Sequence, residues 1–129
     1  MPRNADDVES MLYTLNRNFE GEEGLFLVSS GQSAPPIAIR VDEPIVVVRV
    51  DIGKLPQDAG KHTALFRKLL ELNSSDLMHA AYGLEGDDIV LTAGLELDNL
   101  DANELAATLS DIDLALARHV AELHELAGD

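Results

Sequence analysis

The sequence has no cysteine and no tryptophan, and aromatic residues make up only 4% of its 129 residues. Without cysteine the chain has no disulfide and no thiolate for catalysis or metal binding, a composition that fits the reducing cytoplasm where we expect the protein to reside. Positive charge is also scarce, since nine Lys and Arg face 24 Asp and Glu for a formal net charge of −15. Nucleic acids and anionic membranes attract basic proteins, so we expect neither as a partner.

Long apolar runs are absent as well. The longest strongly hydrophobic run covers residues 45–48 and ends at Arg49, far short of the ~20 residues of a membrane span. Residues 1–7 are polar and acidic, whereas a secretion signal has basic residues followed by an apolar stretch. We therefore expect the protein to stay in the compartment where it is made.

Hydrophobic residues nevertheless form 46% of the chain, which is enough for a packed core in one domain covering residues 1–129. No Lys or Arg occurs between residues 69 and 117, so the second half must present an almost purely anionic surface. That surface has two interpretations: it keeps the protein in solution, or it steers a basic or amphipathic partner.

The first half of the sequence predicts one helix and three strands. Apolar residues recur at helical spacing near the N-terminus, with Asn4 or Asp6 as cap and Gly21 and Gly24 as the end. The residues of this stripe are Val8, Met11, Leu12, Leu15 and Phe19. Residues 25–29, 37–41 and 45–52 are β-prone, and Pro-containing polar stretches separate them, which indicates an antiparallel meander. In the third strand Val46, Val48, Val50 and Ile52 point to one face, and Ile45, Val47, Arg49 and Asp51 to the other.

A second helix is predicted over residues 61–72. Its apolar residues span about 160° of the helical wheel, whereas ~100° is sufficient to seat a helix on one surface. They are Leu65, Phe66, Leu69, Leu70 and Leu72. The width of this stripe indicates that the helix contacts two surfaces.

Two strands and a long helix complete the pattern. The two strands, residues 78–84 and 89–97, flank Gly86 and Asp87, a pair suited to a tight hairpin turn. In the first of these strands we predict that the core-facing residues are Met78, Ala80, Tyr82 and Leu84. Asp101 and Glu104 form a capping box before a stripe that runs from Leu105 to Leu123. The predicted fold is α+β, in the order α-β-β-β-α-β-β-α, with an antiparallel sheet packed by helices.

No catalytic, cofactor-binding or metal-binding constellation is recognisable. His119 and His124 lie about 140° apart on a helix, so they do not share a metal-binding face. We expect His119 to be a hydrogen-bonded packing residue and His79 to lie on the strand surface opposite the core. Asp98, Asp101 and Asn103 depart from the spacing of a calcium loop. We expect a protein that is not an enzyme, and an enzyme with an unrecognised site is the alternative.

The run LNSSDLMHAAYGLEGDDIVL at residues 72–91, with Asn99-Leu100-Asp101 leading into Glu104-Leu105, resembles the CesT-like type III secretion chaperones and the related YbjN-like domains. The resemblance implies a homodimer that holds an extended or partly helical stretch of a client or effector polypeptide without a cofactor. It also implies that the second helix lies at the dimer interface, to which we assign Leu65, Phe66, Leu69 and Leu70. A YbjN-like regulatory or stress-response domain, acting through protein–protein interaction, is the alternative function.

The two-faced apolar pattern of the first and third strands predicts where a client binds. Phe26 and Val28 alternate with Leu25 and Leu27, and Ile45 and Val47 fall outside the core register of their strand. We assign peptide binding to Phe26, Val28, Ile45 and Val47. The alternative is that these are scattered surface hydrophobic residues, which are common in folded proteins.

Overall fold

The structure is a computed structural model that describes residues 4–31 and 34–128. Its six strands form one antiparallel sheet in the order β1-β2-β3-β4-β6-β5. The elements are α1 (Ala5–Thr14), β1 (Phe19–Glu22), β2 (Leu25–Val28), β3 (Ile37–Asp42), β4 (Ile45–Lys54), the 3₁₀ turn η1 (Ala59–Lys61), α2 (His62–Ser75), β5 (Ala81–Glu85), β6 (Asp88–Glu96) and α3 (Ala102–Leu126). The α+β class and the antiparallel sheet packed by helices are as predicted.

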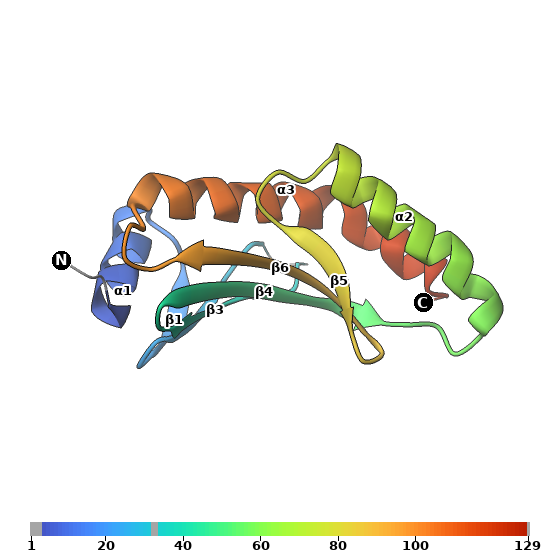
Figure 1. Ribbon diagram of the computed structural model, residues 1–129, viewed down its shortest axis with the longest axis horizontal. Coiled ribbons are helices and arrows are strands. Elements are labelled where there is room, and N and C mark those ends of the chain that lie inside the picture. The colour runs from blue at the N-terminus through green and yellow to red at the C-terminus, as the bar shows by residue number, and fades with distance from the viewer. Residues whose placement is uncertain (1–3, 32–33, 129) are drawn as a thin grey trace.

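The helices cover only one face of the sheet. In Figure 1, α3 and α2 lie above the strands and α1 lies at the end where α3 begins. The core between these layers includes the fully buried side chains of Val48, Leu65 and Ile112, one each from β4, α2 and α3. Among the described elements, no helix covers the opposite face of the sheet, which is below the strands in Figure 1.

The prediction that the first helix continues to Phe19 is wrong. Helix α1 ends at Thr14, Asn16 follows with a left-handed backbone (φ 59°), and Phe19 begins the additional strand β1. Phe19 points toward the core and packs edge-on against Phe26, with ring centroids 5.8 Å apart. Its spacing from Leu15 therefore imitates a helical stripe although the chain has already turned. The observed order has four strands, not three, before α2.

Strand β4 and the final helix agree closely with the predictions. Val46, Val48, Val50 and Ile52 are buried under the helices, whereas the alternate residues face away from them. At the start of α3 the Asp101 carboxylate accepts a hydrogen bond from the backbone N–H of Glu104 (2.8 Å), which is the N-cap half of the predicted capping box. Among the described residues the complete box, with both bonds, is found at α1 between Asn4 and Asp7. Among the helices of the described chain, none combines the length and apolar composition needed for a bilayer crossing.

The strand before the hairpin turn is shorter than predicted. Gly86 and Asp87 do form the turn between Glu85 and Asp88, but β5 begins only at Ala81. Met78, predicted to lie in the core, is 87% exposed, and Leu84 is also exposed. His79 precedes the strand, where its N–H and those of Met78 and Ala80 donate to the Asp111 carboxylate of α3. This carboxylate holds the segment in a loop because it satisfies three successive backbone donors.

Candidate polypeptide-binding surfaces

The uncovered sheet face carries apolar side chains from three adjacent strands, as predicted for Ile45 and Val47. Ile45 is 47% exposed, and Leu25 and Leu27 of β2 are 51% and 41% exposed. Strand registers place Leu25 and Val47 opposite Arg40, and Leu27 opposite Ala38. We call Leu25, Leu27, Ala38, Ile45 and Val47 the bare-face cluster. It is an apolar surface that the described part of the protomer leaves in water.

Phe26 and Val28 do not belong to this surface. Both are buried on the helix-covered side, where they pair with Ile39 and Ile37 of β3. Because side chains alternate along a strand, Leu25 and Leu27 take the positions that the sequence analysis assigned to their neighbours. The four residues predicted to bind peptide are therefore split between the two faces, and only Ile45 and Val47 remain candidates.

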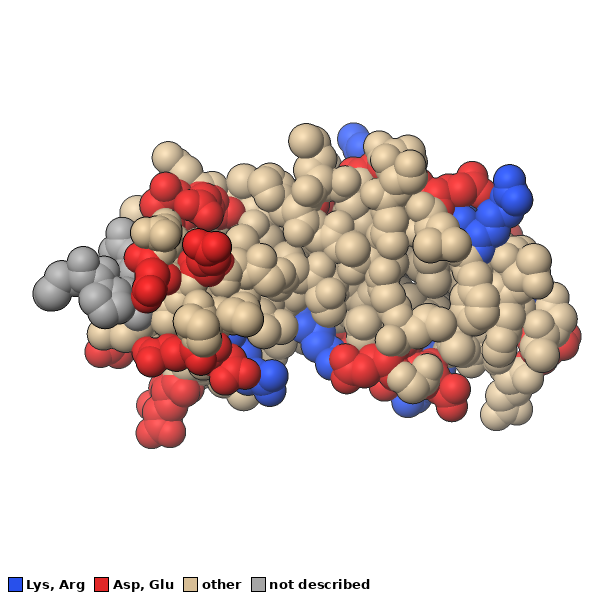
Figure 2. Space-filling model, viewed as in Figure 1, with Lys and Arg blue, Asp and Glu red and all other residues tan. Residues whose placement is uncertain are grey.

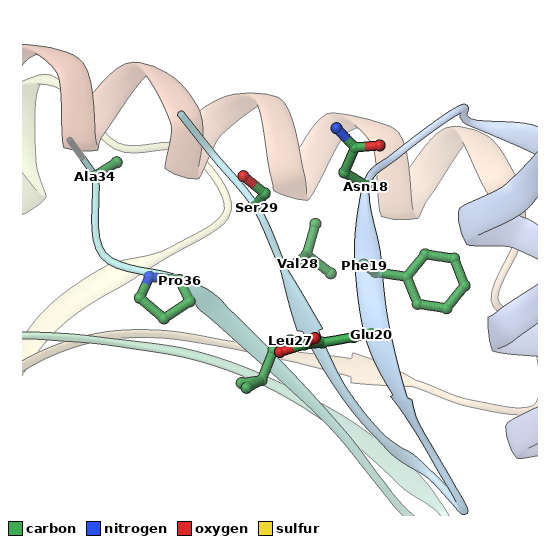
Figure 3. A pocket seen from close by; sticks show the side chains of 8 residues that line it. All are labelled: Asn18, Phe19, Glu20, Leu27, Val28, Ser29, Ala34 and Pro36. Atoms are coloured by element: carbon green, nitrogen blue, oxygen red, sulfur yellow. The ribbon is translucent and has the colours of Figure 1, made fainter. Parts of the chain in front are cut away.

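Two hollows meet at Leu27 on the β1–β2 side of the sheet. One, of about 390 Å³, is lined by Phe19, Glu20, Leu27 and Pro36 among others, and in Figure 3 the Leu27 and Glu20 side chains lie next to each other while Phe19 points toward α1. The second, of about 250 Å³, extends over the bare face between Leu27, Pro36, Ala38 and Arg49. Because Leu27 and Pro36 line both, this end of the bare face is a recess and not a flat surface.

The cations of the bare face are already paired with neighbouring carboxylates. Arg49 hydrogen-bonds to Glu85 (2.6 Å) and to Asp51 (3.0 Å), and these bonds raise the pKa of its guanidinium, Glu85 contributing most. Arg40 lies 3.9 Å from Asp42. These exposed pairs contribute little to folding stability. Their effect is to leave the face without a free positive charge among the described residues.

A second apolar surface lies between α2 and the edge strand β5. A groove of about 270 Å³ is lined by Phe66, Leu69, Leu70, Tyr82 and Leu84 among others. Leu70 is 68% exposed. In Figure 2 uncharged side chains occupy most of the middle of this side of the molecule, over β5 and α2, whereas acidic side chains gather toward the α1 end and near the β5–β6 turn.

The structure divides the four residues predicted for the dimer interface. Leu65 and Leu69 are buried in the protomer core, whereas Leu70 is exposed and Phe66 is partly buried in the groove. The wide stripe of α2 thus serves two purposes: one side holds the protomer together and the other faces outward. Of the predicted interface residues, Phe66 and Leu70 are the two available to a partner.

The side chain of Asn73 closes part of the β5 edge. Its amide oxygen accepts from the backbone N–H of Tyr82 (2.7 Å), and its amide nitrogen donates to the Tyr82 carbonyl (3.1 Å). These are the two contacts that a neighbouring strand makes with a residue it pairs with. At this position α2 supplies a substitute for a strand partner, a role that nothing in the spacing of the sequence indicates.

A hydrogen-bonded network that runs from a buried tyrosine to an exposed carboxylate connects β5, α3 and the end of α2. The Tyr82 hydroxyl lies 2.9 Å from His119 Nδ1, and His119 Nε2 lies 2.9 Å from an oxygen of Asp76. Because a carboxylate only accepts, Nε2 carries the proton of the bond to Asp76. His119 is buried, which agrees with its predicted role in packing. Its two partners explain why a polar ring is tolerated there.

The Tyr82–His119–Asp76 network has the residue order of a catalytic relay, but the pKa of its tyrosine is shifted away from the direction that a nucleophile requires. The hydrogen bond from His119, and secondarily one from Ser75, lowers the pKa of the Asp76 carboxyl. Burial, however, raises the pKa of Tyr82, so its hydroxyl is further from ionisation than a free tyrosine, whereas an activated nucleophile requires the opposite. His124 instead contacts the Ile52 carbonyl (2.9 Å). Within residues 4–31 and 34–128, no three His, Asp or Glu side chains cluster as metal ligands.

Comparison with known proteins identifies the family. Residues 1–129 match the model of the CesT_Tir_1 family. The chain belongs to the CesT_Tir_1 family. A search of curated protein sequences finds no match. Membership confirms the resemblance drawn from residues 72–91 and from the entry to the last helix.

Solved structures confirm the fold of this CesT_Tir_1 protein. A chain of the heterodimeric ExoU–SpcU complex from the type III secretion system of Pseudomonas aeruginosa aligns with a TM-score of 0.69 at 17% identity, over 94% of this chain and 98% of that one. YbjN, a putative transcription regulator from E. coli, aligns with a TM-score of 0.66 at 13% identity, over 92% and 93%. The Yersinia pestis structure of the type III secretion chaperone SycH with a fragment of YscM2 aligns with a TM-score of 0.56 at 19% identity, over 87% and 98%. At these identities the likeness establishes the fold.

Proposed function

We propose that this protein is a non-enzymatic polypeptide-binding chaperone that holds an extended or amphipathic segment of a client protein against its bare sheet face. The observation that carries the proposal is the bare-face cluster, in which Leu25, Leu27 and Ile45 are each more than 40% exposed on one side of the sheet. Exposed apolar patches of this kind mark sites for a partner. The family and the chaperone–effector complexes among its structural neighbours, which include HopA1–SchA, support a polypeptide as that partner.

The proposal includes a homodimer formed through α2 and β5. Phe66 and Leu70 border the apolar groove beside the edge strand, on a side of the molecule whose middle is uncharged. Subunits that each carry −15 repel one another, so their contact must be mainly apolar. The α2–β5 groove meets this requirement and lies apart from the bare face, so one copy can dimerise and bind a client at once.

A regulatory domain of the YbjN kind is the second candidate. The observation that favours it is the alignment of YbjN over 92% of this chain with a TM-score comparable to that of the ExoU–SpcU chain. In that function the same surfaces serve protein–protein interaction outside secretion. The identity of the partner distinguishes the two candidates.

The test begins with capture of partners from the native cell and identification by mass spectrometry, followed by titration of the identified segment. Leu27→Asn removes an exposed leucine from the bare face, and Leu114→Asn removes a similarly exposed leucine (53%) from α3 as the matched control. We expect Leu27→Asn to weaken binding at least tenfold, or about 1.4 kcal/mol, with an unchanged melting temperature. We expect Leu114→Asn to bind like the wild type. Equal affinities of the two variants would refute client binding on this face.

A further inference from the structure

Carboxylates border the bare-face cluster on both sides. Glu20 and Glu22 of β1 lie directly opposite Leu27 and Leu25, and Glu96 of β6 lies opposite Ile45. Because paired residues of adjacent strands project from the same face, these carboxylates stand beside the apolar side chains. Among the ion pairs formed within the described residues, none involves Glu20, Glu22 or Glu96.

The positive charges on this face do not balance these carboxylates. Arg40 pairs with Asp42, and Arg49 pairs with Asp51 and Glu85, all of which lie on or beside the same face. The guanidinium groups are therefore matched before Glu20, Glu22 and Glu96 are considered. The bare-face cluster, with Arg40 and Arg49 interspersed among its residues, is left with a negative border on each side.

We propose that the client segment bound here carries a cluster of apolar side chains flanked on both sides by Lys or Arg. This inference rests on the proposed function and specifies the chemistry of its ligand. The apolar side chains contact the bare-face cluster, and the flanking cations contact Glu20 or Glu22 at one end and Glu96 at the other. Like charges placed opposite each other at an interface are destabilising, so an acidic segment is excluded.

The spacing of the cations follows from the sheet. Four strand intervals separate β1 from β6, and at ~4.8 Å each they amount to roughly 19 Å. An extended chain at ~3.3 Å per residue covers this distance in about six residues, and a helix at ~1.5 Å per residue covers it in about thirteen. These lengths are the spacing at which the backbone of the segment itself spans both borders.

A second copy of this chain and an anionic membrane are poor occupants of the same face. A copy would place its own Glu20, Glu22 and Glu96 near those of its partner, and an anionic lipid surface would meet the same carboxylates. Only an oppositely charged partner gains from both the apolar centre and the acidic border.

The experiment is a selection from a displayed library of random 16-residue peptides against the immobilised full chain at low ionic strength. A parallel selection against Leu27→Asn identifies the sequences that need the bare face. We expect the Leu27-dependent sequences to contain apolar residues with Lys or Arg on both sides, at one of the two spacings above. Leu27-dependent sequences without this basic flanking would overturn the inference and leave the proposed function standing. A library without any Leu27-dependent sequence would overturn both.

Charge-neutralised variants then test the border directly, with one selected peptide as probe. Glu20→Gln, Glu22→Gln and Glu96→Gln are combined in one protein, and Asp87→Asn, Asp98→Asn and Glu125→Gln, which remove as much charge from exposed positions elsewhere, are combined in the control. We expect at least a tenfold loss of affinity for the first protein and less than a twofold change for the control. Equal losses would show that only net charge matters and would overturn the assignment to these three carboxylates.

Discussion

At the scale of single residues, Asp76 is the most informative position. Its carboxylate ends the hydrogen-bonded network from Tyr82 through His119 and also accepts from the Ser75 hydroxyl (2.9 Å). These hydrogen bonds hold the pKa of Asp76 below its ordinary value of 3.8. The folded state therefore stabilises the ionised form of the Asp76 carboxyl more than the unfolded state does.

This gives a prediction for stability at acid pH. A carboxyl whose pKa is lower in the folded state than in the unfolded state stabilises the protein at pH values above the unfolded-state pKa. This contribution to the free energy of unfolding is lost as the pH falls through the folded-state pKa. We expect Asp76→Asn to be less stable than the wild type at neutral pH and the difference to shrink as pH falls below 3.8. Urea unfolding at a series of pH values measures it. Asp98→Asn, at an exposed position, is the control, and a pH-independent difference for Asp76→Asn would contradict the prediction.

At the scale of elements, one side of α2 is buried in the protomer core and the other side is exposed. Leu65 and Leu69 face the protomer core, and Leu70 projects outward beside the β5 edge. Adjacent residues on a helix point about 100° apart, so Leu69 and Leu70 provide a sharp comparison.

We expect Leu70→Glu to give a folded monomer, because it places a charge in the proposed apolar dimer contact and not in the core. Leu69→Glu, at a 5% exposed position, should instead unfold the chain because it buries an unpaired charge. Sedimentation equilibrium and circular dichroism distinguish these outcomes, and Leu114→Glu controls for an added charge on an exposed leucine. A Leu70→Glu protein that still dimerises would exclude this side of α2 from the interface.

The elements that the sequence predicts well are those in which local pattern and tertiary packing agree. The alternation in β4, the Gly86 turn and the Asp101 N-cap each depend on residues close together in the sequence, and the structure contains all three. Strand β1 was missed because Phe19 fits two periodicities, and only Asn16 and the pairing with β2 decide between them. Gly21 is required in this strand, since at its φ of 120° a side chain would clash with the Leu25 carbonyl.

The candidate surfaces were only half predictable. The sequence shows that β2 has apolar residues on both faces, but not which face the helices cover, so the assignment of Phe26 and Val28 was inverted. Contacts between distant segments leave no periodic signal. Asp111 with the 78–80 loop, and Asp76 with His119, therefore became visible only in the structure.

At the scale of the whole molecule, charge acts in opposite directions on the two proposed associations. Dimerisation brings together two subunits of −15 through an uncharged contact, so screening should favour it. Client binding pairs flanking cations with acidic borders, so screening should oppose it.

We therefore expect the dimer to tighten and the affinity for a selected basic peptide to fall between 20 mM and about 300 mM salt, where the Debye length shrinks from roughly 20 Å to about 6 Å. Sedimentation equilibrium and fluorescence anisotropy follow the two processes in the same buffers. A dimer that dissociates with rising salt would indicate an interface made of ion pairs and would contradict the assignment to α2.

The amide of Asn73 makes the two edges of the sheet unequal. An unprotected edge accepts any exposed strand, and head-to-tail pairing at both edges generates an open-ended filament. With the Asn73 amide hydrogen-bonded to the backbone N–H and C=O of Tyr82, β5 cannot pair with an added strand at that residue. An array that begins with a strand added at β1 would therefore meet an obstructed edge at β5. Helix α2 thus opposes fibre formation, a hazard for a protein with the polypeptide-holding function proposed here.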